Sequence, residues 1–383
     1  MTDRHRPAHR ARNAAAAVLV TVLAVSTAAC SKSPDPTPPP TGAQPSSTSS
    51  KASIDIADVQ RFISDVPNWG AEDWKKWATQ NGFKPEDIQA IKGYWDKSKP
   101  SDRAIGGSVK PDKQAPSFRD MTPPARIAAK PQQHPYGADT AVIGKFFLSG
   151  ADGVRQHCSG TVVTDPAHPG KSNLVWTAAH CVHEGKGGGY YKNLMFVPAY
   201  NRSGATSRGG TAETWKEVAP LGRWATVSLV VMPQWIQEGA HVGNQASQFD
   251  FAMIRMTPMD GSRSLEEAVG GAVPIAFNTK QSDITAPKAY GYPVDPPFDG
   301  QELEHCDSGV GVSPFSFLAS RPPMLGIGCT MTGGSSGGGW FTTQNGKRVL
   351  FSNVSIGDDE LGWMAGPTLG AEAKKMFDGF TAG

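Results

Sequence analysis

The string Thr-Ala-Ala-His-Cys occupies residues 177–181, directly after the apolar run Leu-Val-Trp at 174–176. Far along the chain follow Phe-Asp-Phe-Ala at 249–252 and Gly-Gly-Ser-Ser-Gly-Gly at 333–338. Together these segments offer an imidazole, a carboxylate and a hydroxyl. Serine attack on an acyl carbon needs a nucleophile, a base that takes its proton and an acid that fixes the tautomer of the base. We therefore interpret the three segments as one catalytic set.

Each segment has a simpler interpretation when it is taken alone. His180 and His183 could belong to a metal site, but zinc needs three or four ligands and only Cys181 and Glu184 lie nearby in the sequence. A Gly-Ser run is commonly a flexible turn, and an Asp before an apolar run often begins a strand. The order His, Asp, Ser within strand-like flanks favours the catalytic interpretation. No metal, nucleotide or other cofactor is expected.

At these residues the chain resembles the chymotrypsin-like serine peptidases, in their secreted bacterial branch. The resemblance extends from about Tyr136 to the C-terminus, and its anchors are residues 158–161, 174–181, the Asp250 segment, and 334–338 followed by Trp340. It implies an all-β fold of two packed Greek-key barrels, with His180 and Asp250 in the first and Ser336 in the second. It also implies hydrolysis of peptide bonds through an acyl-enzyme intermediate.

The resemblance assigns roles to individual residues. His180 corresponds to the general base, Asp250 to the orienting carboxylate and Ser336 to the nucleophile, and the N–H groups of Gly334 and Ser336 correspond to the oxyanion hole. Substrate contacts are expected from Thr330, Ser355, Ile356 and Gly357. Because no Asp or Glu lies at 330–332 and Val354 replaces the His of glutamate-selecting relatives, we expect a small or apolar substrate side chain. A catalytically silent binding protein and a serine esterase are the alternatives.

The residue before the nucleophile departs from the digestive members of the family. Those enzymes carry an Asp there, which pairs with the N-terminal amine freed by cleavage, whereas this chain has Ser335. A neutral hydroxyl cannot form that ion pair, and no Ile-Val-Gly-Gly-like start follows a basic residue near the domain entry. We therefore predict that the protein is not activated by N-terminal insertion.

Five cysteines suggest a special role for one of them. In the resembled family Cys158 and Cys181 form a disulfide that pins the His loop, which leaves Cys306 and Cys329 to pair with each other. Four cysteines allow three pairings, and the sequence alone does not choose among them. Buried free thiols are the alternative, and these would suit a cytosolic protein.

The N-terminus has the features of an export signal. Residues 1–29 combine a basic start with a short apolar stretch and small residues, a pattern typical of a signal peptide. Cys30 stands where bacterial lipoproteins carry the lipid-modified cysteine, with ordinary signal cleavage as the alternative. Residues 30–53 are rich in Pro, Ser and Thr and are expected to form a linker. We expect an exported protein, extracellular or anchored to the cell surface only through a lipid on Cys30.

Two further segments precede the catalytic region. Residues 54–98 show apolar positions at helical spacing and are expected to form short helices. They could be a pro-segment that assists folding or covers the cleft, or a spacer or partner-binding module. Residues 99–135 return to Pro, Lys, Arg and Ser and are expected to be a second linker with a plausible processing region. A formal net charge of +2, without a basic cluster among aromatics, argues against nucleic-acid binding.

Residues 136–383 have the composition of a turn-rich β-domain, since the chain contains 43 Gly and 31 Pro. Strands are expected at 141–148, 161–163, 174–176, 194–197, 225–231, 251–256, 288–292 and 349–356. Residues 371–380 are expected to form a terminal helix whose apolar side, with Ala373, Met376 and Phe377, packs on the core. We expect a monomer that takes a protein or peptide as substrate.

Overall fold

The computed structural model describes residues 65–80, 85–100, 102, 104–111, 113–114, 122–150, 152–309 and 311–382. These residues belong to one compact unit of the chain, Ile54–Gly383. The predicted signal peptide at 1–29, Cys30 and the linker at 30–53 lie outside the described residues. Within the described ranges, no helix is both long enough and apolar enough to cross a membrane.

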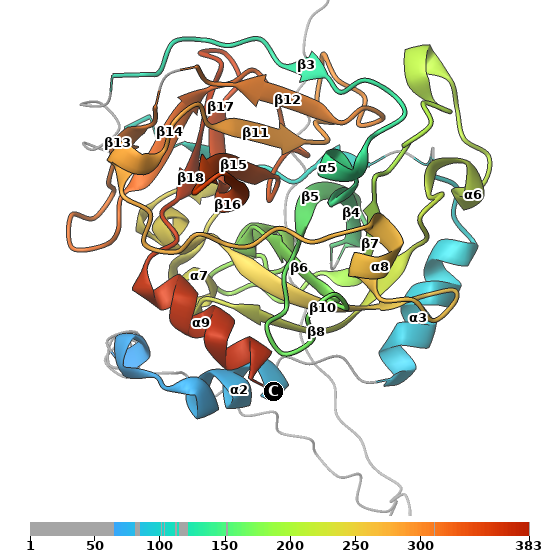
Figure 1. Ribbon diagram of the computed structural model, residues 1–383, viewed down its shortest axis with the longest axis horizontal. Coiled ribbons are helices and arrows are strands. Elements are labelled where there is room, and N and C mark those ends of the chain that lie inside the picture. Colours follow the sequence, from blue (N-terminus) through green and yellow to red (C-terminus); the bar gives the residue numbers. More distant parts are fainter. Residues whose placement is uncertain are drawn as a thin grey trace, which may run out of the picture. The chain divides into compact units, whose positions relative to one another are not determined.

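Six strands in the first half of this unit form a closed antiparallel barrel (Figure 1). They are β4 (Ile143–Ser149), β5 (Arg155–Val163), β6 (Leu174–Thr177), β7 (Lys192–Pro198), β8 (Trp224–Val231) and β10 (Ala252–Pro258). Their order is β5-β4-β7-β8-β10-β6, and β6 pairs with β5 to close the ring. The six runs predicted between 141 and 256 fall on these strands, although the first begins only after the helical turn α5 (Ala138–Ala141).

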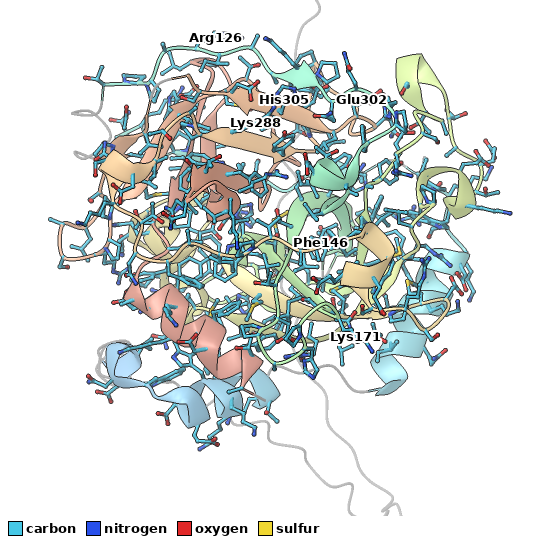
Figure 2. All side chains as sticks on the ribbon, in the orientation of Figure 1. Arg126, Phe146, Lys171, Lys288, Glu302 and His305 are labelled. Carbon is cyan, nitrogen blue, oxygen red and sulfur yellow. A yellow bond between two sulfur atoms is a disulfide. The ribbon has the colours of Figure 1, made fainter. Side chains whose placement is uncertain are left out.

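Large side chains fill this barrel where the facing strand carries glycine. Phe146 on β4, labelled in Figure 2, is buried, and its ring centroid lies 4.9 Å from that of Phe196. A Cβ on Gly160 of β5 would come within 2.6 Å of the Phe146 ring. The barrel interior is therefore a packed core.

The second half is also built from strands, and these fall into two sheets. One has the order β16-β15-β11-β12-β3 and the other β13-β14-β18-β17. Their bounds are β3 (Lys130–Pro131), β11 (Lys288–Gly291), β12 (Glu304–Asp307), β13 (Ser313–Phe315), β14 (Met324–Gly328), β15 (Gly339–Gln344), β16 (Lys347–Asn353), β17 (Ile356–Asp358) and β18 (Trp363–Pro367). A second hydrophobic core takes members from both sheets, among them Trp340 and Met364. The predicted architecture of two packed barrels is confirmed, with the second built from two sheets.

The single strand predicted at 349–356 is wrong, because the chain changes sheets within it. The N–H of Val354 donates to Gly338 O at 2.9 Å, whereas the N–H of the next residue, Ser355, donates to Ala365 O at 2.9 Å. Residues before this point pair with β15 and residues after it pair with β18. Alternating apolar residues continue across the break, so the pattern alone could not reveal it.

Helices cover the outside of the first barrel. Of the predicted helical segment 54–98, residues 54–64 and 81–84 lie outside the described residues, and the remainder contains α2 (Ala71–Gln80) and α3 (Pro85–Asp96). The predicted terminal helix is α9 (Ala371–Thr381), which buries Ala373, Met376 and Phe377 as expected. Figure 1 shows α2 beside α9, and α3 lies against β7 and β8. Trp77 on α2 donates its indole N–H to Val231 O at 2.9 Å, and Trp95 on α3 donates to Asn193 O at 2.6 Å. These N-terminal helices therefore pack on the outer surface of the barrel, and their buried Trp74 and Trp95 belong to the same hydrophobic cluster as the barrel residues.

Residues 99–135 carry three short strands that pair with both halves. β1 (Ile105–Gly106) runs parallel to β5, and β2 (Lys110–Pro111) runs parallel to β9 (Val242–Gly243). β3 pairs antiparallel with β12. The described parts of this predicted linker therefore pair with strands of both halves.

A lysine is buried at the side of the first barrel. Lys145 on β4 has no exposed surface, donates to Gly300 O at 2.8 Å, and lies 4.6 Å from the centre of the Tyr200 ring. Burial disfavours its charged form and lowers its pKa to about 7, while the charge of Asp299 acts in the opposite direction. Between pH 7 and the ordinary pKa of 10.5, the unfolded chain therefore binds more protons at this lysine than the folded chain does.

We expect the free energy of unfolding to rise with pH in this window, and Lys145→Met to remove that rise. Between pH 7 and 9.5 the gain in the wild-type protein should exceed that of Lys145→Met by about 2–3 kcal/mol, because one pKa unit corresponds to about 1.4 kcal/mol. Urea unfolding at both pH values measures the difference, and Lys192→Met, at an exposed lysine of the same barrel, is the control. Equal gains in the wild-type protein and Lys145→Met would contradict the buried neutral lysine.

Candidate active site

Strand pairing brings the predicted His and Asp together. His180 lies in the short helix η2 (Ala179–Cys181) that follows β6, and Asp250 follows the helix η4 (Gln245–Phe249) and precedes β10. β6 and β10 are neighbours, with Ala252 opposite Thr177. Both functional residues therefore leave the same end of the barrel at adjacent positions.

The carboxylate of Asp250 holds the imidazole of His180. Oδ2 lies 2.7 Å from His180 Nδ1, and Oδ1 accepts the backbone N–H of His180 at 2.8 Å. Ser355 from the second half donates its hydroxyl to Oδ2 at 2.6 Å, and Asn353 donates to the Asp250 backbone carbonyl at 3.1 Å. A fully buried carboxylate beside Nδ1 favours the tautomer with hydrogen on Nδ1, which leaves Nε2 able to accept a proton.

Ser336 lies in the turn between β14 and β15, and its hydroxyl contacts the backbone of a distant segment. Ser336 Oγ donates to Gly107 O at 2.9 Å, and the N–H of Gly334 donates to the same oxygen at 3.1 Å. Nε2 of His180 is buried and has no hydrogen-bond partner among the described residues. The Ser336 hydroxyl is therefore directed at the Gly107 carbonyl and not at the imidazole.

The turn that carries Ser336 is fixed by its own hydrogen bonds. Ser335 is buried and donates its hydroxyl to Thr332 O at 2.6 Å, while the N–H of Ser159 on β5 donates to Ser336 O at 2.7 Å. Gly337 has φ +78°, and a Cβ there would lie 2.1 Å from Thr177 Oγ1. The turn thus packs directly on the first barrel, and no charged group is needed at position 335 to close it.

Two disulfides flank the site, Cys158–Cys181 and Cys306–Cys329. These are the pairings that the resemblance implied, and each closes a sequence separation of 23 residues. The first ties β5 to the helical turn that carries His180. Cys158, Cys181 and His180 cluster closely enough to suggest a metal site, but both sulfurs are joined to each other and offer no thiolate.

His183, considered above as a second metal ligand, has a structural role. Its Nδ1 accepts the N–H of Gly185 at 3.0 Å, and its carbonyl accepts the indole N–H of Trp235 at 2.8 Å. Burial lowers its pKa to about 4, with the nearby Glu184 acting in the opposite direction. A neutral His183 therefore supports the loop after His180.

A small cavity of about 20 Å³ lies beside Ser336. Three of the predicted substrate-binding residues, Ser355, Ile356 and Gly357, line it. Thr330 does not, because its N–H and its hydroxyl are engaged with the backbone of Ile127 and Ala129.

Of the other residues that line the cavity, the sequence indicated those at 331–332, Val354 and the Gly-Ser turn, but not Asp359, Met364 or residues 108–110. These other residues are Met331, Thr332, Gly333, Ser335, Val354, Asp359 and Met364, together with Ser108, Val109 and Lys110 from the segment that contacts Ser336. Met331, Val354 and Met364 are buried and give the cavity an apolar wall, whereas Asp359 is exposed. Asp359 lies two residues after the predicted substrate-binding residue Gly357, and this closeness in the sequence could have indicated that it lines the cavity. Nothing in the composition of residues 104–111 indicates their contact with Ser336.

No family model and no curated protein matches this chain. Among solved structures, the thermostable serine protease AL20 from an extremophilic microorganism is 32% identical, with a TM-score of 0.51, over 64% of this chain and 99% of that protein. The protease Anisep from Arthrobacter nicotinovorans is 29% identical, also with a TM-score of 0.51, over 67% of this chain and all of that protein.

We expect Gly337→Ala to destabilise the protein more than glycine strain alone explains. Gly346 has a similar φ of +73° but open space around its Cβ direction, so Gly346→Ala is a matched control that carries only the conformational cost, about 1–2 kcal/mol. Because the Gly337 methyl group would clash with Thr177 and with Ser159 O, its variant should lose at least about 2 kcal/mol more. Urea unfolding of both variants measures this difference. Equal losses would contradict the close packing of this turn on the first barrel.

Proposed function

Because the chain belongs to the chymotrypsin-like serine proteases, we propose that it is an endopeptidase with Ser336 as nucleophile, His180 as general base and Asp250 as orienting carboxylate. One observation carries the proposal. The buried Asp250 carboxylate accepts both the backbone N–H and the Nδ1 hydrogen of His180, so that Nε2 is the nitrogen left to accept a proton. The turn with Ser336 packs against the same end of the barrel through Ser159.

The reaction proceeds in two acyl-transfer steps. When the hydroxyl of Ser336 turns from Gly107 O to Nε2 of His180, the imidazole can take its proton as the oxygen attacks the substrate carbonyl. The carbonyl oxygen becomes negative and is stabilised by the N–H groups of Gly334 and Ser336. Imidazolium then protonates the leaving amine. Water, activated by the same imidazole, releases the acyl group and restores Ser336.

The residues beside Ser336 that would remain after residues 108–110 have left favour a small or apolar substrate side chain. The apolar wall of the cavity, formed by Met331, Val354 and Met364, would leave a buried cation or anion without a partner. Asp359 lies at the exposed side of the cavity, where partial desolvation raises the pKa of its carboxyl and disfavours the charged form that would select a cation.

Export of the protein and lipidation of Cys30 belong to the same proposal. Two disulfides are typical of proteins in an oxidising compartment outside the cytosol. The basic start and short apolar stretch of residues 1–29 support export, and Cys30 would then be the one cysteine outside the two pairs. In this proposal the mature protein acts as a monomer on proteins or peptides at the cell surface or beyond it.

We expect a fluorophosphonate probe to label the purified full-length protein on Ser336, because the activated serine attacks phosphorus as it attacks a carbonyl. Intact mass and peptide mapping measure the stoichiometry and the site. Ser336→Ala should remain unlabelled, and His180→Ala should be labelled at least about 100-fold more slowly because it lacks the base. The labelled wild-type protein should lose its hydrolysis of peptide substrates. Labelling elsewhere, or peptide hydrolysis that survives in Ser336→Ala, would contradict the proposal.

Activation without a new N-terminus is a second expectation. The hydroxyl of Ser335 already donates to Thr332 O, so the turn is closed without an ion pair. Chains with an accessible Ser336 should therefore hydrolyse peptides while their intact mass shows no cut after the signal peptide. Activity that appears only after one cut, and that disappears when the new α-amine is blocked, would show that insertion does operate.

A further inference from the structure

We infer that residues 104–111 are an inhibitory segment bound in the active-site groove of the same chain, with Lys113 in contact just beyond them. This inference rests on the proposed role of Ser336, because it assigns the segment to the groove where that residue acts. Four features of the segment carry it: its contact with Ser336, its backbone pairing on both sides of the site, its lack of side chains at the closest approach, and an ionic contact beyond the site.

The first feature is the contact at the nucleophile. Gly107 O accepts both the hydroxyl of Ser336 and the N–H of Gly334, the two groups that the proposed reaction directs at a substrate carbonyl. A hydroxyl that donates to this oxygen does not donate to His180, and Nε2 accordingly lacks a partner among the described residues. The segment thus occupies the carbonyl site while the nucleophile is not activated. Ser336 is only 4% exposed as a result of this cover and its own packing.

The second feature is backbone pairing that continues on both sides of Ser336. On one side, Ile105 and Gly106 run beside β5, and the N–H of Gly107 donates to His157 O at 2.8 Å. On the other side, Val109 forms a parallel bridge with Ile356. Beyond it, the N–H of Lys110 donates to His241 O at 3.1 Å, where β2 pairs with β9. An extended peptide substrate would add to these same strand edges, so segment and substrate exclude each other.

The third feature is a pair of glycines where the segment meets the turn of Ser336. A Cβ on Gly106 would lie 2.2 Å from the backbone carbon of Gly333, and a Cβ on Gly107 would lie 2.8 Å from Cys158 Sγ. Backbone atoms cannot move aside as the end of a flexible side chain can. Only glycine at position 106 lets the segment approach this closely, which gives a physical reason for the Gly-Gly pair in a stretch that otherwise has the composition of a linker.

The fourth feature is an ionic contact past the groove. Lys113 Nζ lies 3.1 Å from Asp358 Oδ2 and 3.3 Å from Glu360 Oε2. The Asp358 side chain is only 3% exposed and lies at the end of β17, the strand that pairs with Val109 through Ile356. Because Lys113 is half exposed, this contact orients the segment where it leaves the active site and adds little to its stability.

Together these contacts hold the full-length protein in a closed state, and its rate of reaction is set by the fraction of molecules in which the segment has left the groove. The test uses the variant Gly106→Val in the full-length protein. A valine side chain at position 106 cannot fit against the backbone of Gly333, and Gly106 is neither the proposed nucleophile nor the proposed base. Gly93→Ala is the matched control, since Gly93 lies in α3 of the same N-terminal region and has open space around its Cβ direction. Gly107→Ala is a second, milder displacement for use if Gly106→Val does not fold.

The first measurement is the second-order rate constant for fluorophosphonate labelling of Ser336. Gly106→Val should be labelled at least about tenfold faster than the wild-type protein and Gly93→Ala, with Gly107→Ala between them. Rates that are equal in all four proteins, with Ser336 labelled in each, would leave the proposed function standing and overturn the inhibitory segment.

The second measurement does not depend on catalysis. Hydrogen exchange followed by mass spectrometry reports whether the amides of Gly107 and Lys110 are protected, as their hydrogen bonds require. Amides that are protected in the wild-type protein and exchange rapidly in Gly106→Val support a bound segment. If no variant is labelled by the fluorophosphonate, this result still stands, and only the proposed function is contradicted. Rapid exchange of these amides in the wild-type protein would overturn the inference, whatever the labelling shows.

Discussion

The Asp250 carboxylate is the interaction on which the rest of the site depends. It is buried at the seam between the two halves, where it accepts hydrogen bonds from His180 of the first half and from Ser355 of the second. Removing a carboxylate from water is unfavourable unless its oxygens are hydrogen-bonded, so the two halves must dock correctly for this group to be tolerated. Docking in turn brings the turn of Ser336 against Ser159. Stability of the seam and orientation of the base therefore have the same physical origin.

The N-terminal region is also held by contacts with the barrel. Indole N–H groups of Trp77 and Trp95 donate to backbone carbonyls of the barrel, so α2 and α3 are fixed to its outer surface. Residues 105–107, which follow α3 in the sequence, lie beside β5 and contact Ser336. The helices α2 and α3 therefore anchor the N-terminal region to the barrel, and the glycine pair Gly106–Gly107 that follows them contacts the turn of Ser336. The contact with Ser336 comes from Gly107, after these helices, so whether residues 54–98 act as a pro-segment, a spacer or a partner-binding module stays a prediction.

Much of the fold and of the candidate site could be predicted because the signals were local. Strand periodicity located the six strands of the first barrel, and short strings with unusual chemistry located His180, Asp250 and Ser336. Both disulfide pairings followed from the resemblance. The break between β16 and β17 at Val354 could not be predicted, because one long strand and two successive strands show the same alternation of apolar residues. Residues 104–111 were predicted only as linker, because they bind through backbone groups and glycines, which leave no pattern of apolar side chains.

A crystal structure of the full-length protein after reaction with a peptidyl aldehyde that carries a small apolar side chain would test the central claim most directly. We predict a covalent bond from Ser336 Oγ to the aldehyde carbon, its oxygen within hydrogen-bond distance of the Gly334 N–H, and the segment 104–111 displaced from Ser336. An unmodified Ser336 after the protein has bound the aldehyde, or an adduct formed while Gly107 O still accepts the Gly334 N–H, would contradict the account.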